Sequence, residues 1–341
     1  MTSHEKKKYD LFIFWLYSSL VLIFFMVIVG GLTRLTNSGL SITEWELFKG
    51  TLPPFNENSW AYYFDLYKKI PQYDIVNPHM TINEFKVIFY WEYFHRLLGR
   101  FIGLFFLIPL IYFYLSKKID SRYLKTCYLV FILITVQGIV GWYMVESGLV
   151  NNITVSHYRL SLHLTLALII ISTIFWSLLN VNNLTFKKFF SFSKSNLFLL
   201  FLFFLIFFQI IFGAFVSGLD AGRLYQTWPL MNYSYFPDDV SITNFLSLFD
   251  FDNHSLVQFY HRNLAYIITI YILILCYMIL KNKIKKLYKP LKLVIVFLFL
   301  QVILGIFTLI SGLNIYIASL HQIGSVILIF SLLNLYYIHV K

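Results

Sequence analysis

The sequence predicts an all-α polytopic membrane protein in which eight transmembrane helices form two pseudo-symmetric four-helix bundles. The first observation is composition: 59% of the 341 residues are hydrophobic and only 13% are charged, a balance expected of a chain embedded in a bilayer. The second is a set of long apolar segments, and the third is a motif pattern that occurs twice along the chain.

The apolar segments set the order of elements. We expect spans at residues 11–31, 88–115, 123–145, 159–181, 196–217, 256–280, 291–311 and 315–338. Each is long enough to cross a hydrocarbon core of about 30 Å as a helix. No small-residue cleavage site follows the first segment, so we interpret it as an anchor and not as a signal peptide.

The net charge of +11 lies at the membrane edges. Basic residues cluster in alternate loops and tails, within 6–8, 117–125, 187–194, 281–292 and at 341. The positive-inside rule makes that side cytoplasmic, together with both termini. The opposite loops carry most of the acidic residues. Because the cations form separate clusters and no continuous groove, we expect a lipid environment and no nucleic-acid partner.

The two cysteines, Cys127 and Cys276, each lie inside an apolar span. That placement argues against a disulfide framework and against a thiolate-ligated cluster. We interpret both as apolar core residues.

Four histidines lie in two copies of one pattern. The first copy is Glu92-Tyr93-Phe94-His95-Arg96 with Ser161-Leu162-His163, and the second is Gln258-Phe259-Tyr260-His261-Arg262 with Ser319-Leu320-His321. We expect all four within the first two turns of spans that enter from the outer side. An imidazole in hydrocarbon needs a partner, so these four are the predicted metal ligands. The remaining histidines, including the interfacial His157, are expected to be solvated.

A second repeat supports an internal duplication. The segment Gln137-Gly138-Ile139-Val140-Gly141 with Ser147-Gly148-Leu149 recurs as Gln301-Val302-Ile303-Leu304-Gly305 with Ser311-Gly312-Leu313. Four spans per repeat leave both halves facing the same way, which predicts a pseudo-two-fold axis along the membrane normal. We therefore expect two four-helix halves, 1–190 and 191–341, each with a site in its core.

The ligand set favours haem over zinc. Zinc usually takes four ligands, whereas each half offers two histidines, no cysteine and at most one nearby carboxylate. Two imidazoles complete an iron already held by four porphyrin nitrogens. Arg96, Arg100 and Arg262 are expected to bind haem propionates near the outer surface. Anchoring to lipid headgroups is the alternative for each arginine.

One position breaks the duplication. Glu92 lies one helical turn before His95, whereas its counterpart is Gln258. We expect Glu92 in an apolar, aromatic setting on the same face as His95, where it can accept or relay a proton. This predicts catalysis in the N-terminal half and a permanent haem in the C-terminal half. The alternative is that Glu92 reaches the outer surface or pairs with Arg96.

Four segments together resemble the haem A synthase family, in its proteobacterial and mitochondrial branch. They are Gly30 to Ser41 (GGLTRLTNSGLS), Glu92 to Arg100 (EYFHRLLGR), Gln137 to Val145 (QGIVGWYMV) and His157 to Leu164 (HYRLSLHL). The resemblance implies a bacterial inner-membrane oxidoreductase that converts the methyl group of haem O to the formyl group of haem A for terminal oxidases.

Residue roles follow from the resemblance. It implies that His95 and His163 serve the substrate haem, that Glu92 is catalytic, and that His261 and His321 hold haem B. The implied partners are haem O, haem O synthase and terminal oxidase assembly factors, with the electron acceptor left open. Some bacterial members carry paired cysteines in the outer loops, and this chain has none there.

Two other functions fit parts of the pattern. A non-enzymatic dihaem cytochrome also uses histidine pairs, but it typically stacks its haems across the bilayer. A duplicated-half transporter fits the repeat, but no broken helix is evident in the span centres. The outer loops 32–87 and 218–255 are long, and we expect ordered caps over the haem edges.

Overall fold

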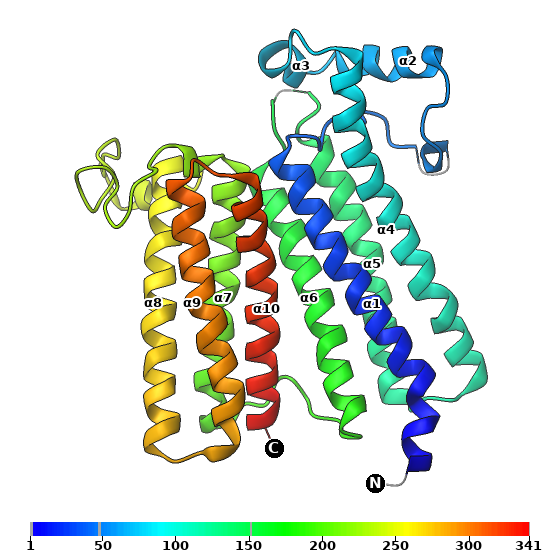
Figure 1. The fold of residues 1–341 in the computed structure, drawn as a ribbon, viewed down its shortest axis with the longest axis vertical. Helices are drawn as coiled ribbons and strands as arrows, with labels where there is room; N and C mark the ends of the chain where they lie inside the picture. Colours follow the sequence, from blue (N-terminus) through cyan, green and yellow to red (C-terminus); the bar gives the residue numbers. More distant parts are fainter. Residues whose placement is uncertain (1–2, 47–48, 151, 341) are drawn as a thin grey trace. The chain divides into compact units, whose positions relative to one another are not determined.

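The computed structural model describes residues 3–46, 49–150 and 152–340. Within them eight helices are long and apolar enough to cross a membrane (Figure 1). These are α1 Ser3–Leu35, α4 Ile82–Ser116, α5 Ser121–Glu146, α6 His157–Asn182, α7 Lys194–Gly218, α8 His254–Lys281, α9 Tyr288–Ile310 and α10 Ile315–His339. The described residues contain no strand beyond one isolated bridge, Met231 to Ser234. The all-α class and the eight predicted spans are confirmed.

The chain divides into two compact units, Met1–Ile174 and Phe175–Lys341. The first contains α1, α4, α5 and most of α6, and the second contains α7 to α10. The end of α6 packs with the second unit: the rings of Trp176 and Tyr336 lie 5.7 Å apart. The Trp176 indole N–H also donates to the carbonyl of Lys187 at 2.9 Å.

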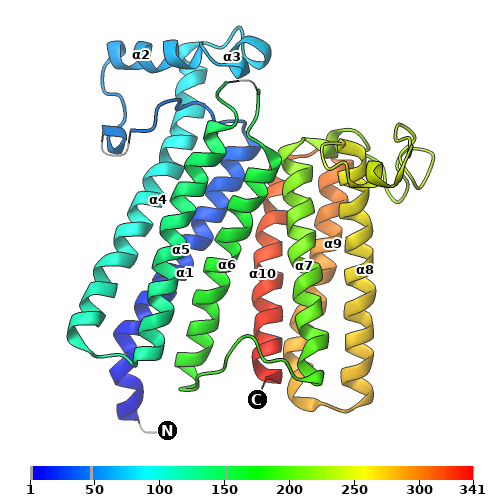
Figure 2. The ribbon, with the colours of Figure 1, turned by 180° about the vertical axis from the view of Figure 1, so that it is seen from behind.

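In the first unit α1 packs along α4, and α4 packs on α5 (Figure 2). The contact between α1 and α4 is aromatic near the start of α1, where the ring of Trp15 lies 4.7 Å from Phe106 and 5.5 Å from Phe113. The Trp15 indole N–H donates to the carbonyl of Phe105 at 3.3 Å. Large rings with one polar atom fix relative position as well as burying area. The pair is therefore held in one register along its length.

In the second unit α7 packs on α8, and α9 packs on α10. The rings of Phe198 and Tyr271 stack 4.3 Å apart between α7 and α8. The Tyr271 hydroxyl donates to the carbonyl of Phe198 at 2.8 Å. An aromatic contact with one hydrogen bond thus fixes a helix pair in this unit too.

The start of α4 differs from the sequence prediction. The helix begins at Ile82 and not near residue 88, because Thr81 and Glu84 form a capping box. The Thr81 amide donates to the Glu84 carboxylate at 2.8 Å, and the Glu84 amide donates to the Thr81 hydroxyl at 3.4 Å. His95 consequently lies about three and a half turns into its helix. The expectation that it lies within the first two turns was wrong.

The first outer loop is a folded cap. Its helices α2 Glu57–Tyr67 and α3 Pro71–Val76 lie over the outer end of α4 (Figure 1). A buried cluster joins the loop to that end of the helix. Its members are Leu40, Ile42, Trp60, Phe64, Tyr67, Ile70, Phe85, Phe89 and Tyr93. Burial of so many large side chains orders the segment, as expected for a cap.

The second outer loop is tied to the start of α8 by one carboxylate. Tyr225 donates to Asp239 at 2.6 Å, and Ser255 donates to its other oxygen at 2.7 Å. Burial alone would raise the pKa of Asp239, but these two hydrogen bonds, together with one from the Asp239 backbone amide, outweigh burial and lower it. The ionised carboxylate is therefore the form that holds the loop.

Replacing this carboxylate should give a pH-dependent loss of stability. A group with a lowered pKa stabilises the fold above the ordinary aspartate value of about 3.9, and the effect is lost as pH falls through the lower folded value. Asp239→Asn should therefore have a lower Tm than wild type at neutral pH. The difference in Tm between the two proteins should disappear below about pH 4. Thermal unfolding in detergent across this range measures it. A gap of constant size at every pH would contradict this role.

Candidate functional site

The structure brings the four predicted histidines together as two facing pairs. His95 of α4 and His163 of α6 have ring centroids 6.4 Å apart. His261 of α8 and His321 of α10 are 6.5 Å apart. A histidine nitrogen binds a metal at about 2 Å, and the ring centre lies about 1 Å further, so one metal between two rings needs about 6 Å. Each pair is spaced for one metal bound from both sides.

Three of the four imidazoles have a buried nitrogen without a protein partner. The Nδ1 atoms of His95, His163 and His321 are enclosed without a hydrogen-bond partner, although buried polar atoms are normally satisfied. Among the described residues no three side chains of His, Cys, Asp or Glu are grouped to hold a metal ion. Two imidazoles suit an iron whose other ligands come from a porphyrin, so the residues present fit haem.

Every one of the four rings packs against a glycine of the preceding membrane-spanning helix. A Cβ added to Gly30 would lie 2.9 Å from Cε1 of His95, and one added to Gly141 would lie 3.0 Å from Cε1 of His163. In the second unit the same distances are 3.1 Å from Gly213 to His261 and 3.0 Å from Gly305 to His321. Any side chain at these positions displaces an imidazole. The sequence repeat contained this signal, but its role was missed.

At three of the four histidines, a glutamine one turn before the packed glycine donates a hydrogen bond to the histidine backbone carbonyl. Gln137 donates to the carbonyl of His163 at 3.0 Å. Gln209 donates to the carbonyl of His261 at 3.1 Å, and Gln301 donates to that of His321 at 2.9 Å. The ligand helix is thereby fixed against its neighbour at the level of the ring.

Glu92 does not lie in an apolar setting, contrary to the sequence expectation. Its side chain is 3% exposed, and Arg96 binds one oxygen through Nη2 at 2.5 Å and Nε at 3.0 Å. The other oxygen accepts from the Ser41 hydroxyl at 2.8 Å and from the Ile42 amide at 2.9 Å. The pairing with Arg96 that the sequence allowed is present. The carboxylate therefore lies in a polar pocket between α4 and the first outer loop.

Gln258 makes a related contact in the second unit. It donates to the carbonyl of Tyr225 at 2.9 Å, and Arg262 donates to the same carbonyl at 2.8 Å. The ligand helices α4 and α8 thus each bind the start of an outer loop through the residue three before the histidine and the arginine after it. The glutamate accepts from a backbone N–H, whereas the glutamine donates to a backbone carbonyl.

The three predicted arginines bind loop carbonyls. Arg96 donates to Ile42 at 2.7 Å, and Arg100 donates to Glu46 at 2.8 Å. Beside them is a cavity of about 20 Å³, room for roughly one water, lined also by Tyr63. In the second unit Nε of Arg262 is buried without a hydrogen-bond partner. All three arginines lie on ligand helices, one or five residues after a histidine, and bind an outer loop.

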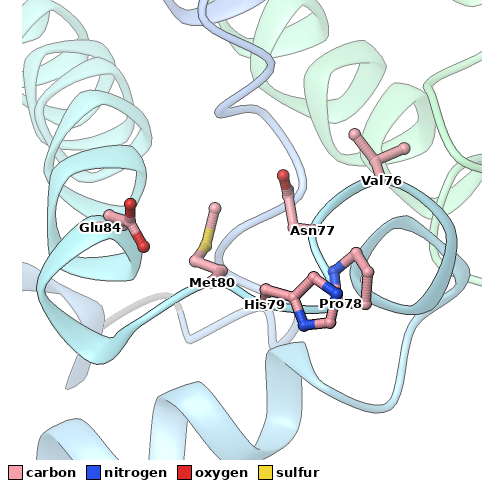
Figure 3. A pocket seen from close by; sticks show the side chains of 6 residues that line it. All are labelled: Val76, Asn77, Pro78, His79, Met80 and Glu84. Carbon is pink, nitrogen blue, oxygen red and sulfur yellow. The ribbon is translucent and has the colours of Figure 1, made fainter.

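Two further features lie apart from the histidine pairs. A pocket of about 280 Å³ opens in the first outer loop (Figure 3), and it is lined by Val76, Asn77, Pro78, His79, Met80 and Glu84. Its carboxylate already serves the capping box of α4. His157 is 7% exposed and its ring lies 4.0 Å from that of Tyr158, so the expectation that it is solvated was wrong.

Comparison with known proteins identifies relatives along most of the chain. Residues 13–333 match the family described as Cytochrome oxidase assembly protein. The Heme A synthase of Pelagibacter ubique is 51% identical over 93% of each chain. The Heme A synthase of Flavobacterium johnsoniae is 39% identical over 93% of this chain and 94% of its own. That of Rickettsia bellii is 41% identical over 92% and 94%.

The glycine contacts can be tested with two glycine-to-alanine substitutions on α5, one at a packed glycine and one at an open glycine. Gly141→Ala places a methyl group 3.0 Å from Cε1 of His163 and should weaken haem binding at this pair by about 1–3 kcal/mol through strain. A Cβ at Gly138 has no atom within 4 Å, so Gly138→Ala should bind haem as wild type does. Haem titration followed by Soret absorbance measures both. Equal affinities for the two variants would refute the steric argument.

Proposed function

This chain belongs to the Cytochrome oxidase assembly protein family, and we propose that it is a haem A synthase, which oxidises the methyl group of haem O to the formyl group of haem A. The observation that carries this is the pair of facing histidine sites, 6.4 Å and 6.5 Å between ring centroids. The relatives named Heme A synthase support the same reaction. The dihaem cytochrome and the transporter have no such support.

The two sites take different haems in this proposal. His95 and His163 bind the substrate haem O, whereas His261 and His321 hold a resident haem B. The support is the single carboxylate at position 92, which has glutamine as its counterpart in the repeat. We also propose that residues 1–190 and 191–341 are the two functional repeats, related by a pseudo-two-fold axis.

The chain supplies ligands, position and proton handling. Haem iron supplies the redox chemistry when it is bound. His95 and His163 orient the substrate haem from both faces, and the cap over α4 excludes water from the ligand helix. Oxidising a carbon releases protons, and the Glu92 carboxylate can accept one. The Ser41 hydroxyl, 2.8 Å away, donates to this carboxylate and helps to hold it in position. Arg96 holds the carboxylate in one orientation for that transfer.

Topology and partners complete the proposal. Both termini are cytoplasmic in an inner membrane, and the haem sites lie toward the periplasmic side, in line with the basic loops. We propose that Arg96, Arg100 and Arg262 would bind the haem propionates. Haem O comes from a haem O synthase, and haem A passes to the assembly factors of a terminal oxidase.

The site assignment predicts selective loss of haem. His261→Ala or His321→Ala should remove most haem B from the purified protein, because an axial bond and the fit of the cavity are lost together. His95→Ala and His163→Ala should keep haem B and bind less haem O. Haem extraction with chromatography measures the composition of each variant. Full haem B in both second-pair variants would disprove the assignment.

The role of Glu92 predicts a large effect on turnover. Glu92→Gln cannot exchange a proton at neutral pH, so haem A production should fall by about 10²–10⁴ while haem B stays bound. Ser41→Ala keeps the carboxylate and removes one hydrogen-bond donor to it. Haem A production by this variant should therefore fall by no more than about tenfold.

Protection of the first outer loop from protease separates chemistry from folding. Glu92→Gln should lose activity with the loop still protected. If the loop opens in proportion to the lost activity in both variants, Glu92 is an anchor of the cap and not a proton acceptor.

A further inference from the structure

The four ligand histidines differ in the hydrogen-bond contacts that they receive from the neighbouring helix. The Gln209 amide binds the carbonyl of His261 and also lies 3.1 Å from its Nδ1. Gln301 binds the carbonyl of His321 and lies 3.5 Å from its Nε2. Gln137 binds the carbonyl of His163 at 3.0 Å. The Oε1 atoms of all three glutamines are buried without a partner, so the sites differ in the contact between the amide and the ring. The second pair therefore has the more complete set of contacts.

At the fourth histidine the corresponding residue is a methionine. Gln137, Gln209 and Gln301 each precede the packed glycine by four residues, and the residue four before Gly30 is Met26. A thioether has no N–H to donate, so His95 receives no such hydrogen bond.

Met26 occupies the place that the glutamines occupy. Its Cε lies 3.4 Å from a Cβ built on Gly99, which follows His95 by four residues. The residues four after the other histidines are also small, namely Ala167, Ala265 and Ser325. At His321 the glycine three residues later, Gly324, faces the glutamine, since a Cβ there would lie 2.5 Å from Oε1 of Gln301. The difference at His95 is therefore chemical and not positional.

We propose that Met26 is a positioning residue that keeps His95 a releasable ligand, so that the first pair exchanges its haem while the glutamine-held second pair retains its own. This rests on the proposed function, in which the substrate haem must leave after each reaction. Near His95 the helices α1 and α4 are joined by packing and by the Thr33 hydroxyl, 3.4 Å from the carbonyl of Trp91. The ring can move away from Gly30 without breaking a hydrogen bond at its own backbone.

The test exchanges the two residue types between the sites. Met26→Gln should slow release of haem O from the first pair by about threefold to tenfold, the effect of one interhelical hydrogen bond in a bilayer. Met26→Leu is the matched control, since it keeps an apolar side chain and should release haem at the wild-type rate. Gln209→Met should speed the loss of haem B from the second pair by a similar factor.

Release is measured on the full-length protein in detergent, loaded with haem and mixed with excess apomyoglobin as the scavenger. Transfer is followed by absorbance, and low-spin electron paramagnetic resonance reports whether both imidazoles stay on the iron. Slower release in Met26→Gln, with the wild-type rate in Met26→Leu, supports the proposal. A higher Tm in Met26→Gln with unchanged release would overturn it, because the glutamine would then act on stability alone.

Two outcomes separate this inference from the proposed function. If wild type releases haem O no differently from His95→Ala, the first pair is not a haem site, and both proposals fail. If wild type binds haem at both pairs but Gln209→Met retains haem B as wild type does, only the role of the glutamine and methionine fails. The second comparison still decides the inference if Met26→Gln does not fold.

Discussion

The contact between each imidazole and the bare backbone of a glycine is the constraint on which the arrangement of this protein depends. At all four positions a Cβ on the glycine would lie 2.9–3.1 Å from Cε1 of the ring. The two helices must approach closely for that contact, and the side chains around it must be small. The spacing of 6.4 Å and 6.5 Å within the histidine pairs is then a property of backbone positions, which are stiffer than side chains.

The ligand helices also hold the outer loops, so the caps and the sites are mechanically connected. Glu92 and Arg96 bind the backbone of Ile42, and Gln258 and Arg262 bind that of Tyr225. These side chains lie within one turn of a ligand histidine. Moving either loop away must therefore break hydrogen bonds within one turn of a ligand histidine. The position of the loop and the position of the ligand helix thus depend on the same few bonds.

Much of this could be predicted from the sequence, and the failures have physical reasons. Hydropathy gave all eight spans, because lipid selects apolar side chains directly. The repeat gave the histidine pairs, because equivalent positions in equivalent helices meet equivalent neighbours. The setting of Glu92 was wrong because its partners, Ser41 and Ile42, come from a loop about 50 residues away, and no periodicity reports such a contact. The early start of α4 was missed because its capping box precedes the apolar run.

We propose that the two halves are copies of one scaffold whose sites came to differ through few changes. Histidines, glycines and small residues recur in both, and these set where a metal can be held. The differences lie beside the ligands: Glu92 against Gln258, and Met26 against Gln209. A carboxylate adds proton exchange, and a thioether removes a hydrogen bond, yet neither changes the volume of the core by much. Because packing depends on volume and chemistry depends on polar atoms, one half can diverge in function while the fold of both is kept.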